Sequence, residues 1–170
     1  MVLHFAAIDN VFDLTEIIPP PNETDSTMPH YPALTLFALT LVALFAKTTL
    51  TSLLQIVSRF GSRRFLLRED ARLVGVEAVS SESFFVQRCD KVWRNDVENL
   101  PLFLMLALTY VLLGATHAEA VWLFSSYVVI RYLHTIAYLR GMQPLRTILY
   151  LSGMAVCWII VARILVEILA

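Results

Sequence analysis

The 170 residues of the chain are unusually apolar, since 58% are hydrophobic and 16% are charged, against about 45–50% and about 25% in typical globular domains. The formal net charge of −1 provides no overall basic field for phosphates, which argues against a nucleic-acid-binding protein. Two cysteines are too few for a small secreted domain held together by disulfides. The length predicts one domain, and the placement of the apolar residues decides whether it lies in water or in a bilayer.

The apolar residues form long runs of the kind that cross a membrane, which requires a helix of about 20 mostly apolar residues. Four candidate spans follow one another along the chain, at residues 33–57, 100–115, 120–139 and 148–170. The second is short, but polar residues with helical spacing precede it and can extend the helix. We therefore expect an all-α integral membrane protein, in which residues 33–170 form a four-helix transmembrane bundle behind an N-terminal tail of residues 1–32.

Basic residues are concentrated on one side of these spans. The segment 58–94 holds 8 of the 13 Lys and Arg residues, whereas the tail holds none and carries acidic residues. Because short loops rich in Lys and Arg stay in the cytosol, this segment and the turn between Arg140 and Arg146 are expected there. Both termini then face the lumen or the exterior. Asn22 begins a triplet that fits the N-glycosylation sequon, and a modified and an unmodified tail both remain open.

Polar residues recur with helical spacing in or beside three of the spans. They are Lys91, Arg94, Asn95 and Glu98 on the second helix, Arg131, His134 and Tyr138 on the third, and Arg146 and Tyr150 on the fourth. Residues three, four or seven apart share one face of a helix, and charged groups at membrane depth usually face the bundle interior. The clusters predict a polar pocket that opens to the cytosol. Ion pairs of structural importance alone, or Lys91 and Arg94 reaching lipid headgroups, remain alternatives for the second helix.

Further charged residues within the spans are predicted to pair inside the bundle. Asp96 is expected to cap a helix or to pair with a neighbour, and Lys47 is expected to reach a polar partner or to line the same pocket. Arg163 and Glu167 are four residues apart, a spacing that predicts an ion pair within one helix.

A pocket with several cationic groups suits a small, soluble, multiply charged molecule. Arginine forks bind carboxylates, a glutamate binds an ammonium group, and an arginine or a hydroxyl stabilises a thiolate, the reactive form of a thiol. Glutathione carries two carboxylates, one amine and one thiol, and so matches all of these groups. A nucleotide or another anion would also attract arginine, so residue types alone leave the ligand open. No metal site and no nucleic-acid partner are predicted.

Four motifs identify a family. They are Leu67-Arg68-Glu69-Asp70 in the basic segment, Arg94-Asn95-Asp96-Val97-Glu98-Asn99-Leu100-Pro101-Leu102-Phe103 on the second helix, His134-Thr135-Ile136-Ala137-Tyr138-Leu139 on the third, and Pro144-Leu145-Arg146 with Tyr150 on the fourth. Together they resemble the membrane-associated proteins in eicosanoid and glutathione metabolism (MAPEG), in the family's order and at close to its spacing. The resemblance covers residues from about 33 to the C-terminus, and its nearest branch is that of microsomal glutathione transferases and microsomal prostaglandin E synthases.

This resemblance implies a four-helix bundle that assembles as a homotrimer in the endoplasmic reticulum membrane, with glutathione between neighbouring subunits near the cytosol. The implied glutathione contacts are Arg59 from an adjacent subunit, Lys91, Arg94, Asn95, Glu98, His134, Tyr138 and Tyr150. Arg146 is implied to stabilise the thiolate, and Thr147 to assist the thiol with its hydroxyl. Asp70 resembles a loop aspartate implied to take part in the synthase reaction.

Three functions are compatible with these motifs. The first is a glutathione transferase with peroxidase activity, acting on lipophilic electrophiles or lipid peroxides, and the second is a prostaglandin E synthase. The third is a non-catalytic lipid-binding member, against which the retained polar residues argue. The sequence departs from the family pattern at Trp93, where a histidine is usual, and in the turn between Tyr138 and Arg146, which is about one residue shorter. These departures leave the lipophilic substrate undefined.

Overall fold

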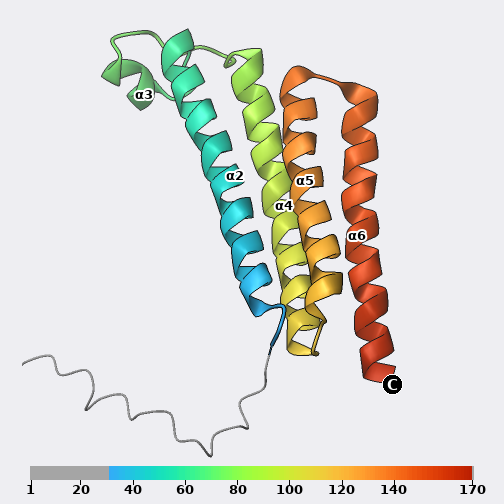
Figure 1. The fold of residues 1–170 in the computed structure, drawn as a ribbon. Helices are drawn as coiled ribbons and strands as arrows, with labels where there is room; N and C mark the ends of the chain where they lie inside the picture. The colour runs from blue at the N-terminus through green and yellow to red at the C-terminus, as the bar shows by residue number, and fades with distance from the viewer. Residues whose placement is uncertain (1–30, 170) are drawn as a thin grey trace, which may run out of the picture. The chain divides into compact units, whose positions relative to one another are not determined.

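The computed structural model describes residues 31–169, and within them the fold is all-helical (Figure 1). Its long helices are α2 (Leu34–Ser62), α4 (Phe84–Leu112), α5 (His117–Arg140) and α6 (Gln143–Leu169), and the short helix α3 (Arg68–Leu73) lies between α2 and α4. The predicted all-α fold is thereby confirmed. Asn22 and the acidic residues of the tail lie outside the described residues.

Three of the long helices, α2, α5 and α6, are long and apolar enough to cross a membrane. The helix α4 has 29 residues, as many as α2, but its charged residues occupy its first half and only the half from Leu100 is apolar. The polar residues before Leu100 extend the helix back to Phe84, as their spacing predicted. The distribution of charges along α4 explains why its apolar segment looked short in the sequence.

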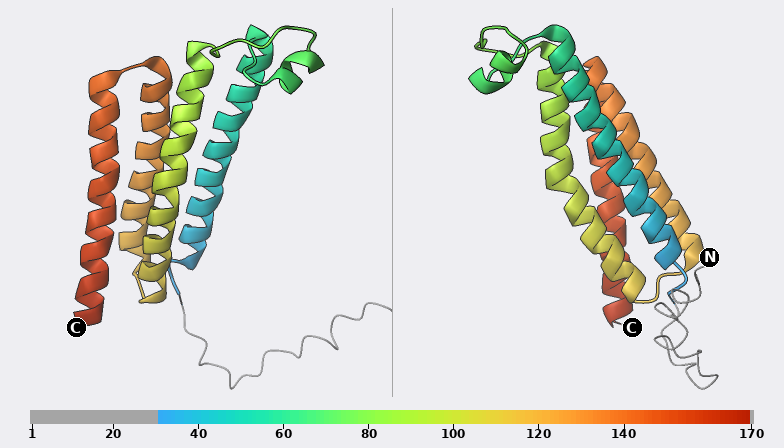
Figure 2. Two further views of the ribbon diagram at one scale, coloured as in Figure 1. Left: turned by 180° about the vertical axis from the view of Figure 1, so that it is seen from behind. Right: turned by 90° about the vertical axis from the view of Figure 1, so that its left-hand side faces the viewer.

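The long helices form an open bundle rather than a closed one. The helices α4 and α5 pack on each other, and α2 and α6 each pack on both of them. Within the described residues α2 and α6 do not contact each other, and they form opposite edges of the bundle (Figures 1 and 2). On each side of the bundle the edge helix therefore keeps a face that no other helix of residues 31–169 covers.

The turn between α5 and α6 is fixed by Gly141 and by Arg88 from the start of α4. Gly141 ends α5 with a φ of 74°, a left-handed conformation that glycine adopts without a Cβ clash. The Arg88 side chain lies against this glycine, and its Nη1 donates to the backbone oxygen of Leu139 at 2.9 Å. The start of α4 is thus tied to the turn from which the first residues of α6 emerge.

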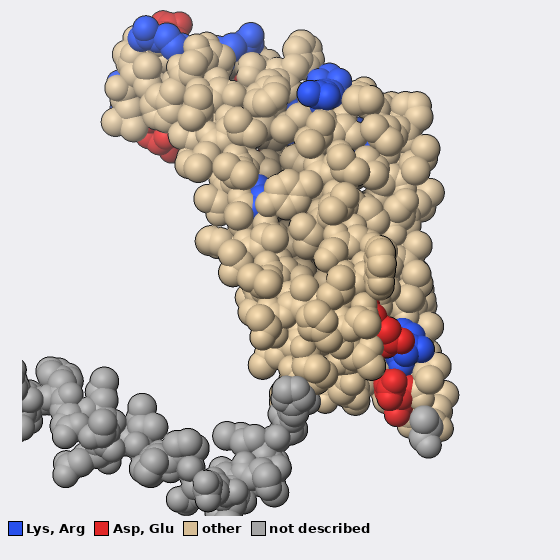
Figure 3. Space-filling view, in the orientation of Figure 1, with Lys and Arg blue, Asp and Glu red and all other residues tan. Residues whose placement is uncertain are grey.

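The outer surface is that of a protein with an apolar middle and charged ends. Large apolar side chains such as Val42, Phe45, Leu102 and Trp158 are more than 60% exposed. Lys, Arg, Asp and Glu gather toward the two ends of the face shown in Figure 3, and most of the middle is free of them. Inside the bundle, the rings of Phe103 and Tyr127 stack with centroids 3.6 Å apart, which joins α4 to α5.

Candidate functional site

A fully buried ion-pair network joins α2, α4 and α5. The Asp96 carboxylate accepts a hydrogen bond from Lys47 Nζ through Oδ2 and one of 2.5 Å from Arg131 Nη2 through Oδ1. The side chain of Lys47 is only 2% exposed, that of Asp96 is 1% exposed and that of Arg131 is 3% exposed. Lys47 thus reaches a polar partner, and Asp96 pairs within the bundle, which was one of the two expectations for each residue; the structure shows that they pair with each other. Counted in their ordinary charged forms, two cations share one carboxylate, so the network has a formal excess of one positive charge.

Two buried nitrogen atoms on α5 have no hydrogen-bond partner within the described part of the chain, Arg131 Nε and His134 Nδ1. Buried polar atoms in native proteins are nearly always hydrogen-bonded, and an unsatisfied one costs about 1–3 kcal/mol. Both atoms are three residues apart on one face of α5. Residues 31–169 therefore leave the hydrogen-bonding capacity of both atoms unused.

A line of three side chains connects α5 to the first turn of α6. The guanidinium carbon of Arg146 lies 4.4 Å from the centre of the Tyr138 ring, a distance at which the ring attracts a cation. The Tyr138 ring in turn meets the His134 ring edge-on, with centroids 5.9 Å apart. No ion pair of Arg146 exists among residues 31–169, so this cation is held by an aromatic face and not by a carboxylate.

The polar face predicted on α4 divides into two parts. Asn95 is half-buried, and its Oδ1 accepts a hydrogen bond of 2.7 Å from Arg131 Nη2. Lys91, Arg94 and Glu98 lie on the exposed surface, where Arg94 pairs with Asp90 at 3.0 Å. Among residues 31–169, Asn95 is thus the one residue of this face that is connected to the buried network, and the other three lie on the surface.

The remaining predicted residues are more dispersed. Arg59 pairs with Glu82 at 2.5 Å and ties the end of α2 to the segment before α4. Asp70 lies on α3, which contacts none of the other helices in the described region. Thr147 is exposed on α6, with its Oγ1 donating to the Gln143 backbone oxygen at 3.5 Å. The chain by itself therefore does not bring Asp70 to the line of Arg146, Tyr138 and His134.

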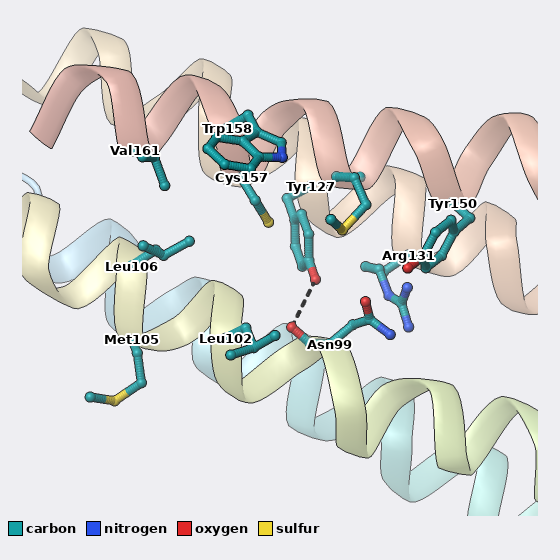
Figure 4. A pocket seen from close by; sticks show the side chains of 12 residues that line it. Asn99, Leu102, Met105, Leu106, Tyr127, Arg131, Tyr150, Cys157, Trp158 and Val161 are labelled. Atoms are coloured by element: carbon teal, nitrogen blue, oxygen red, sulfur yellow. Dashed lines mark hydrogen bonds between the residues drawn. The ribbon is translucent and has the colours of Figure 1, made fainter. Parts of the chain in front are cut away.

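A cavity of about 330 Å³ lies between α4, α5 and α6 (Figure 4). Its walls are mostly apolar, and Tyr150 and Arg131 line it at one end in the view of Figure 4. Tyr127 projects into it from α5 and donates to the Asn99 backbone oxygen at 3.4 Å. Its size and its few polar groups are typical of a small-molecule site. The sequence grouped Arg131 with other polar residues, but did not indicate Asn99, Tyr127 or Cys157 as lining residues.

A second carboxylate-centred cluster lies at the other end of the bundle and corrects one prediction. Arg163 bonds to Glu119 of α5 and not to Glu167 of its own helix. The Tyr110 hydroxyl of α4 donates to the same carboxylate at 2.6 Å. Because α5 and α6 are consecutive and run in opposite directions, the start of α5 lies beside the last turns of α6. Glu119 therefore competes with the intrahelical partner.

The two cysteines are free thiols. Cys89, near the start of α4, is fully buried, and burial raises the pKa of its thiol. A thiol with a raised pKa is protonated and poorly nucleophilic near neutral pH. Cys157 is partly buried on α6 at the cavity wall.

The comparison with known proteins now identifies the family. The model of the MAPEG family matches residues 36–166, from the first turn of α2 to the last turns of α6. This chain belongs to the MAPEG family. Membership of this membrane family and three candidate spans make the MAPEG chain a multi-pass membrane protein.

Three similar proteins of this family carry the name prostaglandin E synthase. The protein from Homo sapiens is 31% identical over 137 residues, which cover 80% of this MAPEG chain and 90% of the relative. The protein from Macaca fascicularis is 30% identical over 137 residues with the same coverage. The protein from Equus caballus is 29% identical over 142 residues, 82% of this chain and 90% of the relative.

Proposed function

We propose that this MAPEG chain is a membrane-bound, glutathione-dependent enzyme that activates glutathione as a thiolate for attack on a lipophilic electrophile or hydroperoxide. One observation carries the proposal. Arg146 stacks on Tyr138 and has no carboxylate partner among the described residues. An arginine already paired with a carboxylate would be neutralised, whereas Arg146 keeps its charge for an incoming anion.

The chemistry required of Arg146 is stabilisation of a sulfur anion. When bound, glutathione supplies the thiol, and a nearby positive charge lowers the free energy of its deprotonated, nucleophilic form. The Thr147 hydroxyl, next in the chain, can donate a hydrogen bond to the same sulfur. Tyr138 holds the guanidinium by its ring face, which leaves the guanidinium N–H groups available.

The remaining donors fit the other charged groups of glutathione. Lys91 presents positive charge on the exposed face of α4, and Glu98 offers a carboxylate for the ammonium group. Arg94 is paired with Asp90, but this pair is exposed, so a ligand carboxylate can take the place of Asp90. The buried atom His134 Nδ1 lacks a partner in the described chain and suits a polar atom of a bound molecule. We therefore assign glutathione binding to these groups together with Asn95, Tyr138 and Tyr150.

Many of the assigned glutathione contacts are exposed on one subunit, so a neighbouring subunit is needed to enclose the ligand. This requirement supports assembly as a homotrimer. The helices α2 and α6 do not contact each other and so keep faces for neighbouring subunits. In this arrangement Arg59 reaches the site of the adjacent subunit, and α4 crosses the bilayer as the fourth span. The basic segment 58–94 supports a cytosolic site, with both termini in the lumen of the endoplasmic reticulum.

The cavity between α4, α5 and α6 supports entry of the lipophilic partner directly from the bilayer. Its apolar wall suits a hydrocarbon chain, and Tyr150 and Arg131 mark its polar end. A membrane location is then useful, because an apolar substrate concentrates in the lipid. The facing α2 of a neighbouring subunit would close the groove.

Prostaglandin E synthase activity is the second candidate. It is favoured by the three relatives of that name at 29–31% identity, and by Asp70 in the segment between α2 and α4. Both candidates begin with the same glutathione thiolate. A lipid-binding role without catalysis is disfavoured, because it gives no purpose to Arg146, which has no carboxylate partner among residues 31–169.

The decisive experiment compares three substrates on one preparation. The chain is purified in detergent, and turnover with glutathione is measured for a halogenated nitrobenzene, a lipid hydroperoxide and a prostaglandin endoperoxide, alongside glutathione binding by calorimetry. Turnover of either of the first two supports the transferase and peroxidase assignment, and turnover of the endoperoxide alone supports the synthase. Absence of both turnover and glutathione binding would refute the enzyme.

A further inference from the structure

The Asn95 side chain is oriented by the buried network and not by its own helix. Its Oδ1 faces Arg131 Nη2 at 2.7 Å. Because arginine carries donors and no acceptors, the Asn95 atom that meets it is the carbonyl oxygen. The amide nitrogen Nδ2 is thereby assigned to the other side, and within the described chain it donates no hydrogen bond to a protein atom.

The Arg131 guanidinium is itself held in place from two directions. Its Nη2 carries two hydrogens, and both have partners, Asp96 Oδ1 at 2.5 Å and Asn95 Oδ1 at 2.7 Å. The second oxygen of Asp96 is bound by Lys47. Rotation of the guanidinium would break bonds to a carboxylate that cannot follow it, since both of its oxygens are engaged.

We propose that Lys47, Asp96 and Arg131 are positioning residues that fix the Asn95 amide as a hydrogen-bond donor toward a carboxylate of glutathione. This inference rests on the proposed function and extends it to residues that do not touch the ligand. The relay runs from α2 through α4 to α5 and back to α4, in four side chains. It gives the network a role beyond joining helices, since buried ion pairs by themselves contribute little net stability.

The geometry separates the two possible roles of the asparagine. With Oδ1 bound to Arg131, Nδ2 offers two N–H groups beside the exposed Lys91, Arg94 and Glu98 of α4. An amide free to rotate would present its oxygen to an anion about as often as its nitrogen. Fixing the amide excludes the repulsive orientation before the ligand binds. The free-energy cost of ordering this side chain on binding is thereby reduced.

The variant Asn95→Asp tests this role without removing the contact to Arg131. A carboxylate there still accepts from Arg131, and it balances the excess positive charge of the network. We expect the melting temperature to be kept or raised, while the dissociation constant for glutathione rises about tenfold or more, because donors are replaced by a repelling charge. An unchanged dissociation constant would overturn the proposal.

A double-mutant cycle tests the relay itself, with the full chain purified in detergent and glutathione as the probe. Arg131→Lys keeps the charge but loses the planar fork that meets two acceptors. We expect it to raise the dissociation constant about tenfold in the wild-type background and to have little further effect in Asn95→Ala. Equal effects in both backgrounds would show a structural role only and overturn the inference.

The controls separate this inference from the proposed function. Melting temperatures of the four proteins of the cycle and of Asn95→Asp show whether each is folded, and Asn95→Asp supplies a folded variant should Arg131→Lys fail to fold. If wild-type protein binds glutathione and the cycle is additive, only the relay is refuted. If wild-type protein does not bind glutathione, the proposed function and the relay both fail.

Discussion

The bundle contains two clusters in which one carboxylate binds side chains from two other helices, and the two clusters differ in how deeply they are buried. Asp96 joins α2, α4 and α5, and Glu119 joins α4, α5 and α6. Asp96 is 1% exposed and is bound by two cations, whereas Glu119 is 38% exposed and is bound by one cation and a tyrosine hydroxyl. Each ties three helices together, yet only the first carries a surplus charge and adjoins the cavity.

This difference in burial separates a polar cluster that contributes to ligand binding from one that contributes only to stability. The cost of removing a charge from water rises with burial, so a buried surplus cation favours binding of an anion nearby. An exposed pair is screened and contributes little. The Asp96 network is therefore expected to influence both stability and ligand binding, and the Glu119 cluster only stability. The following substitutions test this separation.

The largest effect is expected for Asp96→Asn. Removing the carboxylate leaves Lys47 and Arg131 buried side by side without an anion, which typically costs about 3–5 kcal/mol. The free energy of unfolding in detergent, or the melting temperature, measures the loss. Asp90→Asn is the matched control, because its pair with Arg94 is on the surface and is worth less than about 1 kcal/mol. Similar losses in the two variants would contradict the comparison.

Arg146→Ala is expected to reduce turnover about 100-fold or more, as does removal of a group that stabilises charge in a transition state. Glutathione binding should weaken less than turnover, since the thiolate is one of several groups held. Arg163→Ala removes the same side chain at the other end of the bundle and should leave turnover unchanged. Equal kinetic losses would mean that the two ends are not functionally distinct.

Gly141→Ala should destabilise the turn that leads into Arg146. The residue has a φ of 74° and an added Cβ would lie 2.9 Å from Arg88 Nη2, so a loss of about 1–3 kcal/mol is expected from backbone strain. Gly61→Ala is the control, since no atom lies within 4 Å of its Cβ position and it is within α2. That change should be neutral or stabilising by up to about 1 kcal/mol. Thermal unfolding of both variants would measure the contrast, and equal shifts would refute it.

Tyr110→Phe should have the smallest effect. The ring stays buried and only the hydroxyl that donates to Glu119 is lost, a change worth about 1 kcal/mol. Turnover and glutathione affinity should equal those of the wild type. A clear loss of activity would show that the Glu119 cluster is coupled to the site.

The sequence was most informative where composition decides the structure. Apolar runs predicted the helices, and the spacing of polar residues predicted that the helix containing Asp96 begins well before its apolar half. A polar partner inside the bundle was one expectation for both Lys47 and Asp96, because a lone charge at membrane depth needs a partner. That the two residues pair with each other comes from the structure. Such inferences depend on local pattern and on burial, and both are visible in a single chain.

The features that the sequence did not predict are contacts between residues on different helices. Arg163 was assigned to Glu167 by spacing, but the antiparallel packing of α5 and α6 supplies Glu119 instead. The bond from Arg131 to Asp96 joins residues 35 positions apart, and no periodicity indicates it. The cavity arises from the combined outlines of three helices, so its lining residues cannot be inferred from one helix at a time.

The charges of the Asp96 network also bear on how the chain is inserted during synthesis. Lys47 and Arg131 lie near the middle of the candidate spans α2 and α5, where a charged residue raises the free energy of membrane insertion by about 2.5–3.5 kcal/mol, and Asp96 of α4 binds both of them. The helix α4 is the least apolar of the four. Its carboxylate meets a cation from the helix made before it and another from the helix made after it. Integration of α4 is thus expected to be completed only when α5 arrives, so the order of translation becomes part of folding.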